Sequence, residues 1–139
     1  MFMFRSMAWG AVETGGLRTT ANVQVRTRFG PYTPPVPDAG VLSGWLRDAT
    51  DGGGPSLRRA SSLFARTAKA QPFGDGNKRT ALLAANGLLL RDHVNAMLAV
   101  PVEEPDLTIF NDLLGRWYID DDPRVVRWLE EWNLTNPED

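Results

Sequence analysis

The spacing of apolar residues after position 38 predicts a chain built mainly from helices. Asp38 is a capping residue placed before apolar positions at helical intervals, and the glycine-rich linker 51–54 ends this first helix. Pro55-Ser56 opens a second helix with an apolar side of its own. The apolar positions of the two helices include Val41, Leu42, Trp45, Leu46, Ala49, Leu57, Ala60, Leu63, Phe64 and Ala68.

Three more helices are predicted in the second half of the chain. The first of them runs from Asn77 to about Arg91 and is apolar nearly all round. We therefore expect it to be the most buried helix, in the centre of a bundle. A fourth helix is expected from Pro105 to Trp117. The last begins at Asp122-Pro123, where a capping aspartate precedes a proline at the first helical position.

The only strand-like pattern lies between Leu17 and Pro37. Val23 and Val25 alternate with polar residues, and the sequence Phe29-Gly30-Pro31 supplies a turn. The prolines that follow exclude a central strand. We therefore expect an exposed hairpin in a flap at about 17–37, within an all-α bundle of five or six helices that forms one domain over residues 1–139.

Composition and charge narrow the classes of function. The chain has no cysteine, which excludes disulfides, thiolate metal sites and a cysteine nucleophile. Its net charge is −2 with scattered basic residues, which argues against nucleic acid as the main ligand. The longest apolar run, at 81–90, is shorter than the roughly 20 residues of a membrane span, and the N-terminal segment is too short and too interrupted for a signal peptide. We expect a cytoplasmic protein without nucleic-acid or membrane partners.

The start of the helix at Asn77 carries the clearest functional signal. Lys78 and Arg79 stand in its first turn, where free N–H groups and the positive end of the helix dipole already gather. Two cations are unfavourable there unless an anion offsets them. Gly74 and Gly76 allow the backbone to approach a ligand closely. The sequence therefore predicts a phosphate-binding site at this helix start.

Asp75 precedes Gly76 at this predicted site and has two interpretations. Mg²⁺ is usually held by one or two carboxylates together with phosphate oxygens, which makes Asp75 a candidate metal ligand. Asp75 could instead cap the helix, and one residue can serve in both ways.

The loop QPFGDGNKR at 71–79, which opens an apolar helix, resembles the signature of the Fic/Doc family. In that family the loop is His-Pro-Phe-x-Asp-Gly-Asn-(Gly/Lys)-Arg. The segments GLRTTANVQV and FGPYTPPVP are similar to the family's target-docking flap, and PSLRRASSLFARTAKA is similar to the helix that leads into the loop. The likeness leaves out about the first dozen residues and the C-terminal helix. It implies a Fic fold.

The resemblance also implies an activity, the transfer of part of a nucleotide to a hydroxyl group of a target protein. ATP or another nucleotide would bind with Mg²⁺, and Asp75 would hold the metal. The residues implied to bind the phosphates are Gly74, Gly76, Asn77, Lys78 and Arg79. The flap would align the target by adding a strand, through Val25, Arg26, Thr27, Arg28, Phe29, Gly30 and Tyr32.

Lys78 and Leu82 differ from the AMP-transferring members of the family, which have glycine and a second arginine at these positions. The combination is similar to the Doc branch, which transfers the terminal phosphate of ATP to a translation factor. A lysine side chain would occupy space and place charge beside the phosphates, and so change how a nucleotide can lie. The expected partner is a protein that carries the target hydroxyl, for example a translation factor.

Gln71 stands where the family has its catalytic histidine. Histidine can take a proton near neutral pH, whereas glutamine can hydrogen-bond a hydroxyl but cannot take its proton. The only histidine, His93, is predicted at the far end of the helix, roughly 20 Å away, and cannot substitute. Gln71 is either a natural divergence or a deliberate inactivating substitution.

Three functions remain as alternatives at this point. The first is a toxin-like phosphotransferase or nucleotidyltransferase that is impaired at Gln71. The second is a binding module without catalysis, and the third is a repurposed enzyme of small-molecule or peptide metabolism. No glutamate follows a serine or threonine by four residues, as it does in the family's inhibitory helix. Any inhibition is therefore expected from a separate antitoxin-like chain.

Overall fold

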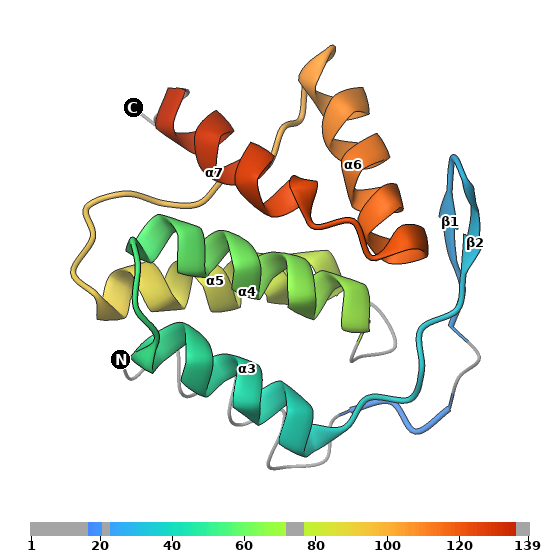
Figure 1. The fold of residues 1–139 in the computed structure, drawn as a ribbon, viewed down its shortest axis with the longest axis horizontal. Helices are drawn as coiled ribbons and strands as arrows, with labels where there is room; N and C mark the ends of the chain where they lie inside the picture. Colours follow the sequence, from blue (N-terminus) through green and yellow to red (C-terminus); the bar gives the residue numbers. More distant parts are fainter. Residues whose placement is uncertain (1–16, 21–22, 72–76, 136–139) are drawn as a thin grey trace.

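The computed structural model describes residues 17–20, 23–71 and 77–135, which form one β-hairpin and five helices (Figure 1). This architecture agrees with the all-α bundle and short hairpin expected from the sequence. The elements in chain order are β1 (Val25–Thr27), β2 (Gly30–Tyr32), α3 (Ala39–Asp51), α4 (Ser56–Ala70), α5 (Asn77–Arg91), α6 (Asp106–Asp120) and α7 (Arg124–Thr135).

The hairpin is antiparallel, and its register pairs Val25 with Tyr32 and Thr27 with Gly30. Gly30 has a φ of 126°, a conformation that other residues rarely adopt, so it suits the turn. Within the described residues these two strands form the only sheet. The hairpin expected near residues 23–33 is therefore confirmed.

The helix ends follow local signals in some places and differ from them in others. The side chain of Asp38 caps α3 by accepting a hydrogen bond from the N–H of Val41 at 3.0 Å, as predicted. Helix α6 continues three residues beyond the predicted end at Trp117, and Asp121 closes it in the left-handed conformation. Helix α7 begins at Arg124 rather than at the proline before it.

Helix α4 holds the central position among the described helices, where the sequence pattern led us to expect α5, although α5 buries seven of its 15 residues and α4 six of 15. It packs against α3, α5, α6 and α7, and it runs antiparallel to α5 (Figure 1). Small buried residues of α4, such as Ala65 and Ala68, let its neighbours approach closely. Helix α5 buries Leu88 and Leu89 completely, but Leu83 and Leu90 stay 47% and 57% exposed.

A row of aromatic rings joins α4, α6 and α7. Phe64 contacts Phe110 with ring centres 6.2 Å apart, and Phe110 contacts Trp128 at 6.1 Å. Trp128 in turn stacks on Trp132. These tryptophans serve helix packing, as expected for large aromatic residues. None of the described helices is long and apolar enough to cross a membrane.

Candidate functional site at the junction of α4 and α5

Gln71 is the residue that ends α4, and the nitrogen and the oxygen of its side-chain amide are both hydrogen-bonded. Its φ and ψ are 46° and 56°, a left-handed conformation at the helix cap. Its Nε2 donates to the carbonyl of Ala68 at 2.6 Å, and its Oε1 accepts from Nδ2 of Asn77 at 3.0 Å. Gln71 is 8% exposed and Asn77 is 6% exposed. The glutamine therefore ties the end of α4 to the start of α5.

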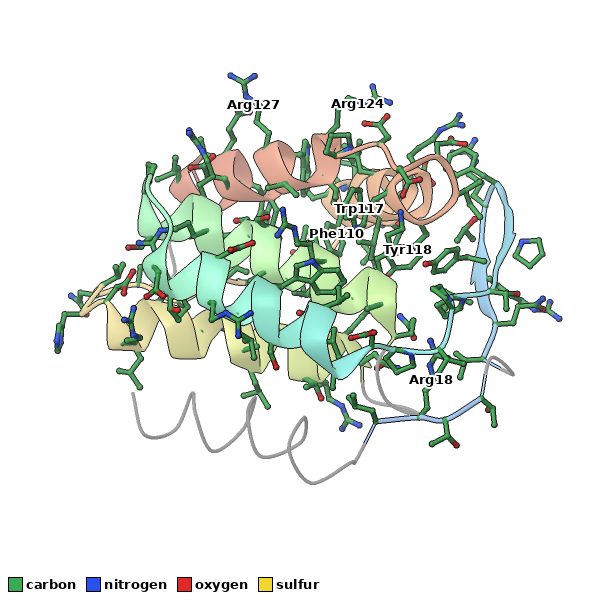
Figure 2. All side chains as sticks on the ribbon, turned by 60° about the horizontal axis from the view of Figure 1, so that its bottom comes forward. Arg18, Phe110, Trp117, Tyr118, Arg124 and Arg127 are labelled. Atoms are coloured by element: carbon green, nitrogen blue, oxygen red, sulfur yellow. The ribbon has the colours of Figure 1, made fainter. Side chains whose placement is uncertain are left out.

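Arg18, labelled in Figure 2, donates hydrogen bonds to three separate segments of the chain at this junction. Its Nε donates to the carbonyl of Gln71 at 2.5 Å, and its Nη2 donates to Ala70 at 3.1 Å and to Pro35 at 2.6 Å. Its Nη1 donates to Thr20 at 2.7 Å. The carbonyls at the end of α4 carry the negative end of the helix dipole, which favours a cation there. Arg18 thus joins both ends of the flap segment to Gln71 at the end of α4.

Tyr118 of α6 approaches the same glutamine from the other side. Burial raises the pKa of Tyr118 strongly, and the nearby Gln71 amide lowers it in part. The buried Tyr118 hydroxyl has no hydrogen-bond partner among the described residues. A buried hydroxyl in that state is rare and calls for an explanation. With its pKa raised, the phenol stays protonated and can only donate or accept a hydrogen bond.

The β-hairpin packs against α6. Tyr32 stacks on Tyr118 with ring centres 5.3 Å apart, and burial raises the pKa of Tyr32 while Arg18 lowers it. The guanidinium of Arg116 lies 3.8 Å above the ring of Phe29. At Gly115, a Cβ would lie only 3.2 Å from the side chain of Phe29, so glycine allows the hairpin to approach the helix.

The residues predicted to hold phosphates are only partly described. Asn77 begins α5, and Lys78 and Arg79 follow in its first turn with exposed side chains. An exposed pair of cations at a helix start suits an anion that arrives from solvent. Gly74, Asp75 and Gly76 lie outside the described residues, as do Pro72 and Phe73.

The flap residues do not share one environment. Arg26 and Arg28 are exposed, whereas Val25, Thr27, Phe29, Gly30 and Tyr32 are partly buried. Arg28 forms an ion pair with Asp112 of α6 at 2.6 Å. His93 is exposed just past the end of α5, so it stays apart from the junction as expected.

Arg18 and Tyr118 are the two site residues that the sequence analysis missed. Arg18 is separated from Gln71 by 53 positions, so no local spacing could connect them. Tyr118 lies just past the predicted end of the fourth helix. The sequence indicated these two residues only through their positions. Arg18 lies in the predicted flap segment, and Tyr118 follows the apolar face of a predicted helix.

Comparison with known proteins completes the description of the site. Residues 7–89 match the model of the Fic/DOC family, a stretch that includes the hairpin, α3, α4, Gln71 and most of α5. No curated protein and no solved structure matches the chain significantly. Helices α6 and α7 lie outside the matched residues. The stacking partner of the hairpin, Tyr118, is therefore contributed by a helix beyond the family match.

Proposed function

The chain belongs to the Fic/DOC family, and on that premise we propose that it is a toxin-like transferase that acts on a protein hydroxyl and is impaired at its base position. In this proposal the start of α5 binds the phosphates of ATP or another nucleotide through Asn77, Lys78 and Arg79. The hairpin aligns the target chain by adding a strand at its edge.

The observation that carries the proposal is the geometry of Gln71. It ends the helix before the loop, in the position of the family's histidine, and its amide holds Asn77 at the first residue of the phosphate-binding helix. Lys78 and Arg79 follow with exposed side chains. This arrangement supports a phosphate-binding site at the start of α5 that lacks a general base at position 71.

Mg²⁺ is part of the proposal through Asp75, and Gly74 and Gly76 would contribute their backbone to phosphate binding. A single carboxylate beside a phosphate site is the donor set that Mg²⁺ commonly uses, together with phosphate oxygens. The metal would neutralise phosphate charge when bound.

Gln71 limits the chemistry at the target hydroxyl. In the transfer the hydroxyl oxygen forms a bond to the terminal phosphorus, the bond from that phosphorus to the leaving nucleoside diphosphate breaks, and the hydroxyl proton must go to an acceptor. Oε1 of Gln71 keeps one lone pair beside its bond from Asn77 and can accept a hydrogen bond from the hydroxyl. It cannot take the proton. The proton must pass to water, which makes transfer slow.

The decisive experiment restores the base with Gln71→His. A neutral imidazole can keep the hydrogen bond to the Ala68 carbonyl through its N–H, and its other ring nitrogen, once released from the bond that Asn77 now makes to Gln71, has the lone pair that takes the hydroxyl proton. We expect transfer to a lysate protein to rise by about 10²–10⁴-fold. Because Lys78 is present, label from the terminal phosphate of ATP should move to the target and label from the adenine should not.

Two controls make this experiment specific. Gln71→Ala removes the amide without adding a base and should give no gain in transfer. Gln71→His combined with Arg79→Ala keeps the base but weakens the phosphate site, so the gain should disappear. If neither label reaches any protein after the restoration, in a variant that still binds ATP, the transferase proposal is wrong.

A second candidate function is supported by the same hydrogen bonds. They give Gln71 a structural purpose that needs no catalysis, as in a Fic-fold binding module or a repurposed enzyme for a small molecule or peptide. A Gln71→His protein that binds its partner unchanged and transfers nothing would favour this alternative.

A further inference from the structure

Helix α4 is cationic along its whole length, although the chain as a whole is acidic. It contains four basic residues and no acidic one, while the chain has 17 acidic and 15 basic residues. Arg59 is mostly buried and paired with Asp92 at 2.7 Å. Arg58 and Arg66 point outward on one face, two helical turns apart, with Ser62 between them. This face has no role in the transferase proposed above.

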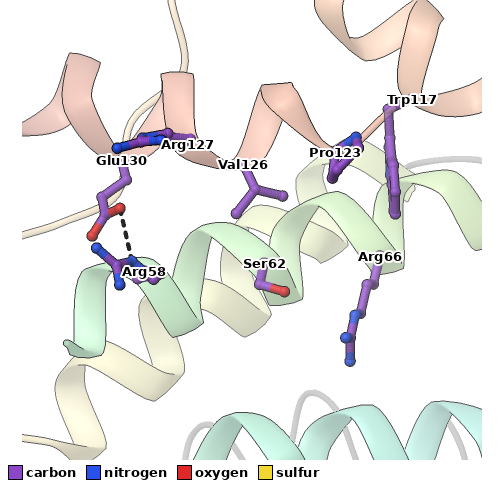
Figure 3. A pocket seen from close by; sticks show the side chains of 8 residues that line it. All are labelled: Arg58, Ser62, Arg66, Trp117, Pro123, Val126, Arg127 and Glu130. Carbon is purple, nitrogen blue, oxygen red and sulfur yellow. Dashed lines mark hydrogen bonds and ion pairs between the residues drawn. The ribbon is translucent and has the colours of Figure 1, made fainter. Parts of the chain in front are cut away.

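The outward face of α4 forms the floor of a groove that we name the α4–α7 groove (Figure 3). It is lined by Arg58, Ser62 and Arg66 of α4, Trp117 of α6, and Val126 and Arg127 of α7, and it encloses about 510 Å³. Arg58 and Arg127 lie at one end, and Trp117 and Arg66 lie at the other (Figure 3). Trp117 is fixed in place because its Nε1 donates to the carbonyl of Ala65 at 2.8 Å.

Positive side chains outnumber negative ones in the α4–α7 groove, with three arginines and one glutamate. Glu130 is the only carboxylate among its lining residues, and it is paired with Arg58 at 3.1 Å. Within the described part of the chain, Arg66 makes a single ion pair, with Asp48 at 3.9 Å, which is too long for a hydrogen bond. Arg127 pairs with Glu131 at 3.3 Å, where both side chains are more than 60% exposed and the pair is weak. Two guanidinium groups can therefore donate to an arriving anion.

A second groove continues the first along α4. It shares Arg66 and Trp117 with the first, encloses about 690 Å³, and reaches Tyr32 of the hairpin and Trp45 of α3. Its lysine is paired with Asp121, it also contains Asp38 and Asp48, and its remaining walls are largely apolar, so this second groove suits apolar side chains rather than carboxylates. From Arg58 to Lys69 the two grooves follow α4 for roughly 16 Å, at 1.5 Å per residue. This length suits a peptide of about five extended residues or a helix of about three turns better than a small molecule.

We propose that the two grooves along α4 form a docking surface for an acidic, amphipathic segment of a partner protein. Its carboxylates would contact Arg66 and Arg127, where bidentate hydrogen bonds from guanidinium groups favour carboxylates. Its apolar side chains would lie against Trp117 and Trp45. Binding at this surface requires neither nucleotide nor transfer.

The test is selection of binders from a displayed library of random 12-residue peptides on the unmutated protein. We expect enriched peptides to carry at least two Asp or Glu residues beside aromatic or aliphatic ones. One enriched peptide is then synthesised with a fluorescent label, and its affinity is measured by anisotropy. The double variant Arg66→Glu, Arg127→Glu should weaken binding at least tenfold, because it reverses both available charges.

The matched control is Arg47→Glu, Arg124→Glu, which reverses two exposed arginines outside both grooves. It should change affinity less than twofold. Arg58 is left intact because its loss would leave Glu130 buried without its partner, and thermal unfolding checks that both variants fold. Enrichment of peptides without acidic residues, no enrichment at all, or equal weakening by the two double variants would overturn the proposal.

Discussion

Arg18 offers the sharpest test of how the candidate site is held together. Arg18→Met keeps much of the length of the side chain and removes every donor. The hydrogen bonds to Thr20 and Pro35 are exposed, so those carbonyls can turn to water. The bonds to Ala70 and Gln71 are partly buried, and their carbonyls would lose a charged donor with less access to water.

The expected loss comes mainly from the two partly buried carbonyls. An unsatisfied buried group costs about 1–3 kcal/mol, so we expect a loss of roughly 3 kcal/mol in the free energy of unfolding. For a chain of this length that loss corresponds to a decrease in Tm of about 10 °C. Calorimetric or circular-dichroism melting measures it directly.

Two further variants show whether the stability comes from the hydrogen bonds of Arg18 or only from its positive charge. Arg28→Met removes an arginine whose side chain is 70% exposed and whose partner is Asp112, and it should cost less than about 1 kcal/mol. Arg18→Lys keeps the charge but cannot reach several carbonyls at once, so most of the loss should remain. If Arg18→Met melts within the range of Arg28→Met, the role assigned to Arg18 is wrong.

Three further predictions follow from the same structure. Tyr118→Phe should leave the free energy of unfolding unchanged or raise it by up to about 1 kcal/mol, because it removes a buried hydroxyl without a partner; a loss of more than 1 kcal/mol on thermal melting would show that the hydroxyl is bonded. Burial by itself raises the pKa of Asp92, but hydrogen bonds from Ser56 and Arg59 and the charges of Arg59 and Arg91 hold the pKa below its ordinary value. Asp92 therefore contributes stability above its unfolded pKa of about 4 that is lost as the pH falls further, and urea titrations should show a flatter acid decline for Asp92→Asn. Arg79→Ala should weaken the binding of ATP, measured by calorimetry, by about 1.5–3 kcal/mol, and an equal effect of Arg47→Ala would contradict a local phosphate site.

Local signals in the sequence were enough to predict much of this fold. Asp38 caps α3, and Pro55 precedes α4, because capping and proline effects depend on a few neighbouring residues. Helix α6 ends at Asp121 in a left-handed conformation without the glycine that usually marks such an end, so its true length was not predicted. Apolar periodicity also could not show that one side of α5 would leave Leu83 exposed.

The candidate site was predicted where it is continuous in sequence and missed where it is not. Gln71, Asn77 and Arg79 could be predicted as site residues because they follow one another along a loop and a helix start, and the structure joins Gln71 to Asn77. Arg18 and Tyr118 reach Gln71 only through the folded chain, across 53 and 47 positions. Contacts of that kind leave no periodic pattern.

The close contact between Gly115 and the hairpin means that changes on α6 can move the hairpin while the sequence of the loop at 71–79 stays the same. The hairpin rests on α6 through Gly115, Arg116 and Tyr118, and all three lie beyond the residues that match the family. A methyl group at position 115 would lie 3.2 Å from the side chains of Phe29 and Thr27, so the hairpin would have to shift slightly away from α6. Substitutions on α6 could thus adjust the height and tilt of the flap in small steps while 71–79 stays the same.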